Sequence, residues 1–427
     1  MKSFLLSLGL VAAICDATKP APAQFFHHQL IDHVDPYGDY RDEEWTHRYY
    51  TWDKHFQGPG SPIFLIFGGE GQIPPEKGLV YPFVTDHLAK IFGGYVLQPE
   101  HRFYGESQPL YHHHPDKRAR QDPRVNLFTP EQALHDAMHL LTHIQEELGC
   151  SKDKFSSEYC PVITVGGSYP GWLSAMARVV FPYQVDISYA GSAPMKFYSQ
   201  QVDVSAYYNH ITEVADKMLP GCADAVRTSL YDIKATILSG AATEKNLGIC
   251  EGTIPDYIDT KTPEGLQILV DEIMMVVGYT FANDNMANYP PGNTTRLYAA
   301  CQTFTSYKNA FHKLQEFLVT RLRQGDNCWA MTRQLPAGPN ATISSGDWSG
   351  VGTGNDGDSW DFQTCTLLVE AIGFSNSSMF PPRDWSLDWM TNHCQQRYGV
   401  TPDPYSLVYR WKFDDLAEAN VTRIRKL

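Results

Sequence analysis

Apolar residues in the first half of the chain gather in short runs separated by longer amphipathic stretches. Residues 62–67 form a continuous apolar run that ends in a glycine-rich segment at residues 68–71, which is typical of a buried parallel strand. Residues 81–92 carry a pattern compatible with a helix, and residues 95–99 resemble a second strand. Strands that alternate with helices in this way predict a parallel sheet covered by helices.

The same alternation continues to about residue 190. Residues 129–132 have the composition of a capping box with proline in the first turn, and apolar residues then recur every three or four positions up to Leu148. Residues 161–167 predict another strand, an apolar helix pattern follows at once, and residues 185–190 predict the next strand. We therefore expect an α/β fold built on a mostly parallel, doubly wound sheet.

The pattern changes after residue 194. Helical stretches such as residues 262–277 and 305–322 are separated by loops that hold most of the cysteines, which predicts a helical insertion above the carboxyl ends of the strands. Residues 420–424 have the pattern of a strand that returns to the sheet. The expected segments are a signal peptide at 1–17, the N-terminal part of the core at 18–194, a helical cap insertion at 195–398 and a return to the core at 399–427.

The beginning of the chain predicts export from the cytoplasm. Lys2 precedes an almost wholly apolar run at residues 4–14 and a small-residue exit near Ala17, which is the composition of a secretory signal peptide. The run is too short to span a bilayer, and we predict no membrane partner. A buried N-terminal helix is the alternative interpretation.

The cysteine pattern agrees with an exported protein. Cys15 lies in the predicted signal peptide, and the eight cysteines that follow form an even set, which predicts disulfides without deciding their pairing. Cys150 and Cys160 are close enough in sequence to bridge the loop before the strand at residues 161–167. Because no C-x-x-C motif occurs, a zinc site or a thioredoxin-type motif is not expected, and we predict no metal and no other cofactor.

The net charge and the glycosylation motifs indicate which partners and which compartment to expect. The formal net charge of −14 arises from 48 acidic and 34 basic residues, which argues against nucleic acid or an anionic membrane as a partner. It would also suit an acidic compartment. The sequence leaves the oligomeric state open, and a dimer is compatible with it. Four sequons fit a secretory route, at Asn293, Asn340, Asn376 and Asn420.

The strongest chemical signal is the segment at residues 166–169, where two glycines and Ser168 separate a predicted strand from a predicted helix. This arrangement is typical of a nucleophile elbow, which lifts a serine hydroxyl above the edge of a sheet. The backbone N–H of Tyr169 and those of the turn at Glu70 and Gly71 are candidate donors to an oxyanion. Pro170 occupies the position where the usual elbow has glycine, and proline is tolerated in the first turn of a helix.

Other polar clusters give weaker signals. Glu100 and His101 follow a predicted strand, where they would touch substrate, brace the elbow or form an ion pair between loops. His135, His139 and His143 lie one helical turn apart and fall opposite the apolar stripe, so a solvated face is favoured over a metal site. The loop histidines at residues 112–114 have no partner acid at a diagnostic spacing.

A serine nucleophile in this fold needs an acid and then a histidine later in the chain. Only His210, His312 and His393 follow Ser168. Two of them fall in the predicted cap, and His393 adjoins Cys394. None is expected to be the general base.

Several motifs together resemble the secreted and lysosomal serine peptidases that include Pro-Xaa carboxypeptidase and dipeptidyl-peptidase II. The similar segments are residues 26–33, 68–71, 100–107, 166–169 and 360–366, and the likeness runs from about Phe26 to Ile424. The resemblance implies an α/β-hydrolase core with a helical cap, a peptide substrate, and cleavage near a chain end, commonly after proline. Ser168 matches the nucleophile, and the site residues that these motifs imply for substrate are Glu100, His101, Trp360, Asp361 and Gln363.

The chain departs from the family pattern at its end, before the loops that carry the catalytic Asp and His. We therefore expect a truncated form whose triad is incomplete. The location implied by the resemblance is secreted, lysosomal or vacuolar. Two alternatives stay open: a non-catalytic secreted glycoprotein that binds peptides, and an esterase or lipase on the same fold.

Overall fold

The structure is a computed structural model that describes residues 21–76, 78–79, 81–110, 122–323, 327–334 and 354–415. Several predicted features lie outside these residues: the signal peptide at 1–17, the histidines at 112–114, the sequons at Asn340 and Asn420, and the strand at 420–424. Of the other two sequons, Asn293 and Asn376 are both exposed.

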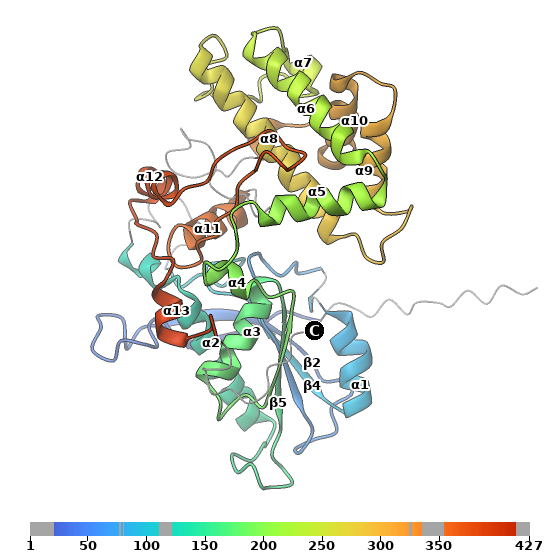
Figure 1. Cartoon of the computed structure of the whole chain (residues 1–427). Helices are drawn as coiled ribbons and strands as arrows, with labels where there is room; N and C mark the ends of the chain where they lie inside the picture. The colour runs from blue at the N-terminus through green and yellow to red at the C-terminus, as the bar shows by residue number, and fades with distance from the viewer. Residues whose placement is uncertain are drawn as a thin grey trace, which may run out of the picture.

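A six-stranded sheet forms the lower layer of the molecule (Figure 1). Its strand order is β1-β2-β4-β3-β5-β6, in which β4, β3, β5 and β6 are parallel and the first two strands are antiparallel. The parallel part confirms the predicted α/β sheet, whereas the first two strands were not predicted. The bounds are β1 Gln24–Leu30, β2 Glu44–Trp52, β3 Ile63–Ile66, β4 Tyr95–Pro99, β5 Val162–Gly167 and β6 Ile187–Gly191.

Helices cover both faces of this sheet. Successive side chains of a strand point to opposite faces, and in β3 both sets are apolar, so each face needs a cover. Ile63 and Leu65 of β3 pack with α2 (Pro130–Glu147) and α3 (Tyr169–Val180). Phe64 and Ile66 face the other way, toward a π-helical turn η1 (Phe83–Leu88) and α1 (Ala89–Phe92). The predicted cap of α2 is present, since the Thr129 hydroxyl accepts a hydrogen bond from the Gln132 N–H at 3.2 Å.

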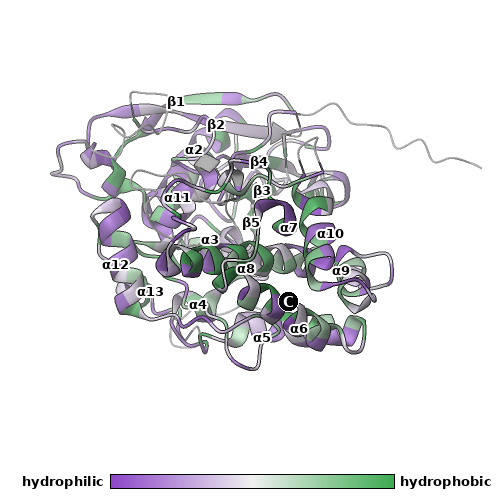
Figure 2. Ribbon diagram, turned by 90° about the horizontal axis from the view of Figure 1, so that it is seen from above, coloured by the Kyte–Doolittle hydropathy of each residue, from purple (hydrophilic) through white to green (hydrophobic). Residues whose placement is uncertain are grey.

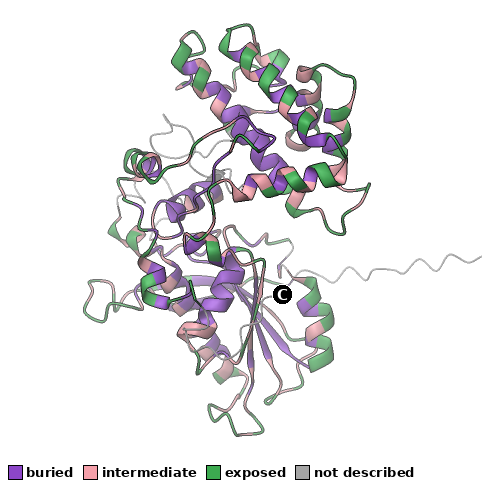
Figure 3. Cartoon of the chain, viewed as in Figure 1, coloured by how far each residue is buried: buried purple, intermediate pink, exposed green. Residues whose placement is uncertain are grey.

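A second layer above the sheet consists of helices with their own hydrophobic cluster (Figure 1). Its central helix, α8, is long and apolar enough to cross a membrane by length and composition, but 78% of that span is buried inside the molecule. Figures 2 and 3 show α8 as apolar and buried. The bounds are α5 Ala206–Met218, α6 Cys222–Leu238, α7 Glu244–Leu247, α8 Pro263–Met286, α9 Arg296–Thr305 and α10 Ala310–Leu322.

Other helices of the C-terminal half return to the sheet layer. Tyr198 of α4 (Met195–Tyr198), Trp360 of α11 (Gly354–Thr364) and Trp411 of α13 (Ser406–Trp411) belong to the same cluster as α2 and α3. The predicted insertion at 195–398 therefore holds helices of both layers, and its boundaries stay a prediction. The other short helices are η3 (Pro123–Leu127), η4 (Met331–Arg333) and α12 (Leu387–Tyr398).

All eight cysteines that follow the predicted signal peptide form disulfides. Cys150 and Cys160 are bonded, as their spacing allowed. Two bonds fasten the helical layer, and one ties α11 to α12. This complete pairing fits an oxidising compartment. The three further bonds are Cys222–Cys301, Cys250–Cys328 and Cys365–Cys394.

Candidate active site

Ser168 lies in a single-residue turn between β5 and α3. Its backbone has φ 60° and ψ −132°, and φ values of this sign are uncommon for residues other than glycine. The turn is fixed from both sides, because the Ser168 N–H donates to Gly191 O at 3.0 Å and Ser168 O accepts from the Trp172 N–H at 3.1 Å. The predicted sharp bend between strand and helix is therefore present.

Two glycines allow the strand and the helix to meet at this turn. A Cβ on Gly166 would lie 2.0 Å from Pro170 O, and a Cβ on Gly171 would lie 2.7 Å from Gly191 O. Real side chains never approach backbone atoms so closely, so both positions require glycine. Pro170 is accepted at the start of α3, because the first helical N–H groups need no partner within the helix.

The hydroxyl of Ser168 is exposed and is not used to cap α3. Other helix-starting residues behave differently: the side chains of Thr129, Thr262 and Ser386, for example, each accept an N–H of the following turn. Among the described residues, the Ser168 hydroxyl has no hydrogen-bond partner. The group is thus available to an incoming ligand.

The predicted oxyanion turn lies beside the elbow. Strand β3 pairs with β5, and the loop after β3 reaches Pro170, since a Cβ on Gly69 would lie 2.5 Å from Pro170 Cγ. Farther along, the Gln72 N–H donates to an Asp356 oxygen at 3.3 Å. The backbone at Glu70 and Gly71 is therefore held between α3 and α11, next to the first turn of α3, where N–H groups attract negative charge.

Tyr81 is a neighbour of the elbow that the sequence did not indicate. A Cβ on Gly167 would lie 3.0 Å from the Tyr81 hydroxyl oxygen, and this hydroxyl is hydrogen-bonded to the Gly167 backbone. Burial raises the pKa of Tyr81 above its usual value, so the phenol stays protonated. Its position within a predicted helix gave no sign of this contact.

The side chains predicted to touch substrate are all buried. The exposed fractions are 1% for Glu100, 4% for His101, 2% for Trp360, 0% for Asp361 and 1% for Gln363. Each of these side chains instead contacts other parts of the protein. These five residues therefore have no surface on which a substrate could rest in this structure.

Glu100 forms the ion pair that was one of its three predicted roles. Its carboxylate accepts from Arg48 Nε at 3.1 Å and from the N–H of Ile73 at 3.0 Å. The N–H groups of Glu106 and Ser107 also donate to it, at 3.0 and 3.1 Å. A buried carboxylate with this many donors fastens the loops after β3 and β4.

His101 and Gln363 both meet the residue that follows the candidate nucleophile. The Tyr169 hydroxyl lies 2.9 Å from His101 Nε2 and 3.4 Å from Gln363 Nε2. Gln363 Oε1 accepts from the Tyr104 hydroxyl at 2.8 Å. The ring of Trp360 packs 5.4 Å from that of Tyr169.

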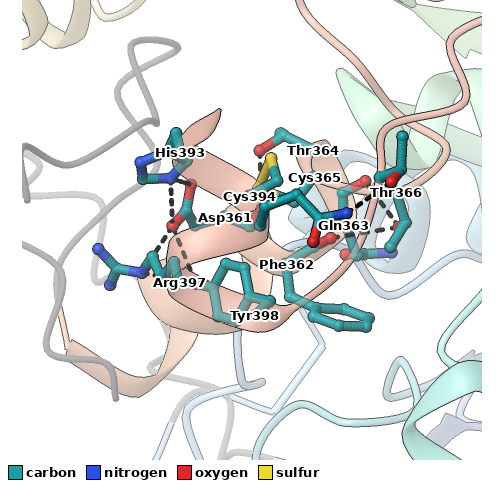
Figure 4. The surroundings of a disulfide bond; sticks show 12 residues. Asp361, Phe362, Gln363, Thr364, Cys365, Thr366, His393, Cys394, Arg397 and Tyr398 are labelled. Carbon is teal, nitrogen blue, oxygen red and sulfur yellow. Dashed lines mark hydrogen bonds and ion pairs between the residues drawn. A yellow bond between two sulfur atoms is a disulfide. The ribbon is translucent and has the colours of Figure 1, made fainter. Parts of the chain in front are cut away.

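Asp361 is the centre of a second buried network, next to the Cys365–Cys394 disulfide (Figure 4). Its carboxylate lies 3.1 Å from His393 Nε2 and 2.9 Å from Arg397 Nε. The positive charge of its partners lowers the pKa of Asp361 despite its burial. Although Asp361, Cys365 and His393 place possible metal ligands within 4.8 Å of one another, the Cys365 sulfur is already bonded to Cys394.

The histidines that follow Ser168 are engaged elsewhere. His393 is paired with Asp361, while His210 on α5 and His312 on α10 are exposed. Among the described residues, none of the three is hydrogen-bonded to Ser168. The structure therefore offers no general base from these positions.

The histidine face of α2 is only partly solvated: the His143 side chain is 40% exposed, but the prediction of a solvated face is in error for His135 and His139. His135 and His139 are half-buried beneath the N-terminal segment: His33 stacks on His135 at 5.7 Å, and His139 Nδ1 lies 2.8 Å from Gln29 Oε1. The unpredicted strand β1 covers this face, which explains the error. His33 also pairs with the buried Asp136.

Comparisons with known proteins agree with the geometry. The family described as Serine carboxypeptidase S28 matches residues 32–412 of the chain. Two relatives named lysosomal Pro-X carboxypeptidase, from Pongo abelii and Homo sapiens, are each 25% identical over 390 residues, which cover 89% of this chain and 71% of the relative. A relative named thymus-specific serine protease, from Homo sapiens, is 30% identical over 388 residues, covering 86% of this chain and 68% of the relative.

Proposed function

The chain belongs to the serine carboxypeptidase S28 family, a family of serine exopeptidases with the α/β-hydrolase fold, and on that premise we propose that Ser168 is its nucleophile. One observation carries the proposal: an exposed hydroxyl, unused as a helix cap, stands at a positive-φ turn between β5 and α3. Backbone in such a sparsely populated conformation is found mainly at functional sites. In this fold the turn raises the nucleophile above the sheet.

The proposed chemistry is acyl transfer. The Ser168 oxygen attacks the carbonyl carbon of a peptide bond, the hydroxyl proton passes to the nitrogen, and the C–N bond breaks to release the amine. Water then hydrolyses the acyl-enzyme, which releases the free acid and restores the Ser168 hydroxyl. The N–H of Tyr169 and the backbone N–H groups at Glu70 and Gly71 stabilise the negative charge that forms on the carbonyl oxygen. Tyr81 closes one side of the turn.

The substrate class follows from the relatives. Because two of them are named lysosomal Pro-X carboxypeptidase, we infer that this chain cleaves proline-containing peptides near a chain end, in a lysosome or after secretion. Four disulfides support an exported protein. The five buried residues Glu100, His101, Trp360, Asp361 and Gln363 are assigned to holding the site instead of binding substrate.

Peptide cleavage tests this proposal. The whole chain is incubated with a set of peptides that carry proline at the second position from either end, and products are identified by mass spectrometry. Because His210, His312 and His393 offer no general base, we expect slow cleavage at a single terminal position, and we expect it to disappear in Ser168→Ala. Cleavage that persists in Ser168→Ala would assign the nucleophile to another residue.

A second function is favoured by one specific observation. No histidine among the described residues is hydrogen-bonded to Ser168, so a non-catalytic glycoprotein that binds peptides is the other candidate. In that case the same peptides would bind the folded chain, as measured by calorimetry, without being cleaved.

A further inference from the structure

The side chain of Tyr169 is an inner member of a buried chain of hydrogen bonds. Only 1% of Tyr169 is exposed, and its hydroxyl contacts His101 on one side and Gln363 on the other. Tyr104 extends the chain beyond Gln363. The chain thus connects the loop after β4, the first residue of α3, and α11.

The direction of every hydrogen bond in this chain can be assigned. His101 Nδ1 lies 2.7 Å from the carbonyl oxygen of Arg102, and a carbonyl can only accept, so Nδ1 carries the proton. In a neutral ring Nε2 then accepts, and the Tyr169 hydroxyl must donate to it. Burial lowers the pKa of His101 to about 4, so the ring is neutral near neutral pH.

The other half of the chain follows from this assignment. Because the Tyr169 proton points to His101, its oxygen is open to the amide N–H of Gln363. The Gln363 carbonyl oxygen in turn accepts from the Tyr104 hydroxyl. Each donor serves one acceptor, and reversing any bond would leave two donors or two acceptors facing each other.

These hydrogen bonds act on the residue next to the proposed nucleophile. Tyr169 is the first residue of α3 and directly follows Ser168, and the next residue is Pro170, which has no N–H. The first turn of α3 is held by the backbone bonds of Ser168 and Trp172, and Pro170 adds no N–H bond to them. The buried contacts of the Tyr169 side chain supply a further restraint at the residue whose N–H is the proposed oxyanion donor.

Gln363 is itself held rigidly. It lies on α11, which is tied to α12 by the Cys365–Cys394 disulfide and by the Asp361–His393 pair on the next turn (Figure 4). Buried groups fixed by several partners keep one rotamer. The network around Asp361 thus holds Gln363 in place for its contact with Tyr169.

We propose that His101 and Gln363 are positioning residues, which lock the phenol of Tyr169 and thereby aim the N–H that follows Ser168. This inference rests on the proposed function, since it assigns that N–H to the oxyanion. The two side chains act only through Tyr169 and do not touch substrate.

Substitutions in the hydrogen-bonded residues test the proposal, and a second buried pair provides a matched control. His101→Ala and Gln363→Met remove one partner each, Tyr169→Phe removes the hydroxyl, and His101→Gln keeps an acceptor oxygen near the place of Nε2. The control is another buried tyrosine–glutamine pair, in which the Tyr279 hydroxyl donates to Gln334 Oε1 at 3.0 Å in the helical layer. Tyr279→Phe and Gln334→Met are its variants.

The first readout is the rate at which a fluorophosphonate probe modifies Ser168. We expect His101→Ala, Gln363→Met and Tyr169→Phe to slow the reaction by about tenfold or more, because small displacements of a donor are costly. His101→Gln should stay within about threefold of the wild type by restoring the acceptor. Equal rates in all variants, or no rescue by His101→Gln, would overturn the proposal.

The second readout does not need a reactive serine. Hydrogen exchange is followed at the amides of Ser168 and Trp172, which are both hydrogen-bonded across the turn. We expect about tenfold faster exchange in His101→Ala and Gln363→Met, and no change in the control pair. If exchange at these amides is the same in His101→Ala and Gln363→Met as in the wild type, the positioning role is wrong. If exchange changes as expected but the wild type is not labelled by the fluorophosphonate, only the assignment of Ser168 as the nucleophile is wrong.

Discussion

Replacing Ser168 by glycine is expected to stabilise the protein. A residue with a side chain at φ 60° and ψ −132° costs about 1–3 kcal/mol, and glycine adopts this conformation without that cost. Glycine also loses more backbone entropy on folding, which opposes the gain by about 0.5–1 kcal/mol. The net expectation is that Ser168→Gly is more stable than Ser168→Ala by about 1 kcal/mol.

Ser205 provides the control for this comparison. It also starts a helix, α5, but with φ −88°, which any residue can adopt. Both positions share the preference for glycine over alanine at the start of a helix. The Gly–Ala difference in the free energy of unfolding at Ser205 is therefore subtracted from that at Ser168, which isolates the effect of positive φ. The free energy of unfolding is measured for all four variants by urea titration. If the two Gly–Ala differences are equal, the strained turn does not exist in solution.

Three further predictions concern a glycine of this turn, the buried His101, and two exposed histidines of the helical layer. Gly166→Ala should destabilise the protein by about 3 kcal/mol or more in urea titration, because its Cβ would overlap backbone atoms at 2.0 Å, whereas Gly292→Ala, with open space around it, should be close to neutral. His101 has a pKa of about 4 in the folded protein and 6.5 in the unfolded chain. As the pH falls from 6.5 toward 4, the unfolded chain therefore binds a proton that the folded protein does not, and the free energy of unfolding decreases. About 2 kcal/mol of unfolding free energy should disappear between about pH 7.5 and pH 5, and His101→Gln should reduce this loss by that amount; an unchanged loss would contradict the assignment. His210→Ala and His312→Ala should change the rate of fluorophosphonate labelling less than about twofold, since both side chains are exposed on cap helices, and a large loss in either would identify a missed base.

The strand–serine–helix unit could be predicted because its signals are local. The β-branched run of β5, the glycines that follow it and the helix pattern after Ser168 are adjacent in the sequence. The cap of α2 at Thr129 is local in the same sense. The parallel strands β3 and β4 could be predicted from short apolar runs, which are typical of a sheet covered on both faces.

The contacts that hold the site could not be predicted in this way. Gln363 meets Tyr104 and Tyr169 across 259 and 194 positions, and the side-chain pattern of an element does not reveal partners at such distances. Strand β1 was missed because its polar and histidine-rich residues do not resemble a buried strand. Its absence from the prediction also made the face of α2 that bears His135 seem solvated.

Covalent labelling gives the most direct evidence on whether Ser168 is the nucleophile. The folded chain is treated with a fluorophosphonate and digested, and the modified peptide is mapped by mass spectrometry. We predict one adduct, on the peptide that contains Ser168, and none in Ser168→Ala. A folded chain that stays unmodified, or an adduct that survives the Ser168→Ala substitution, would contradict this assignment.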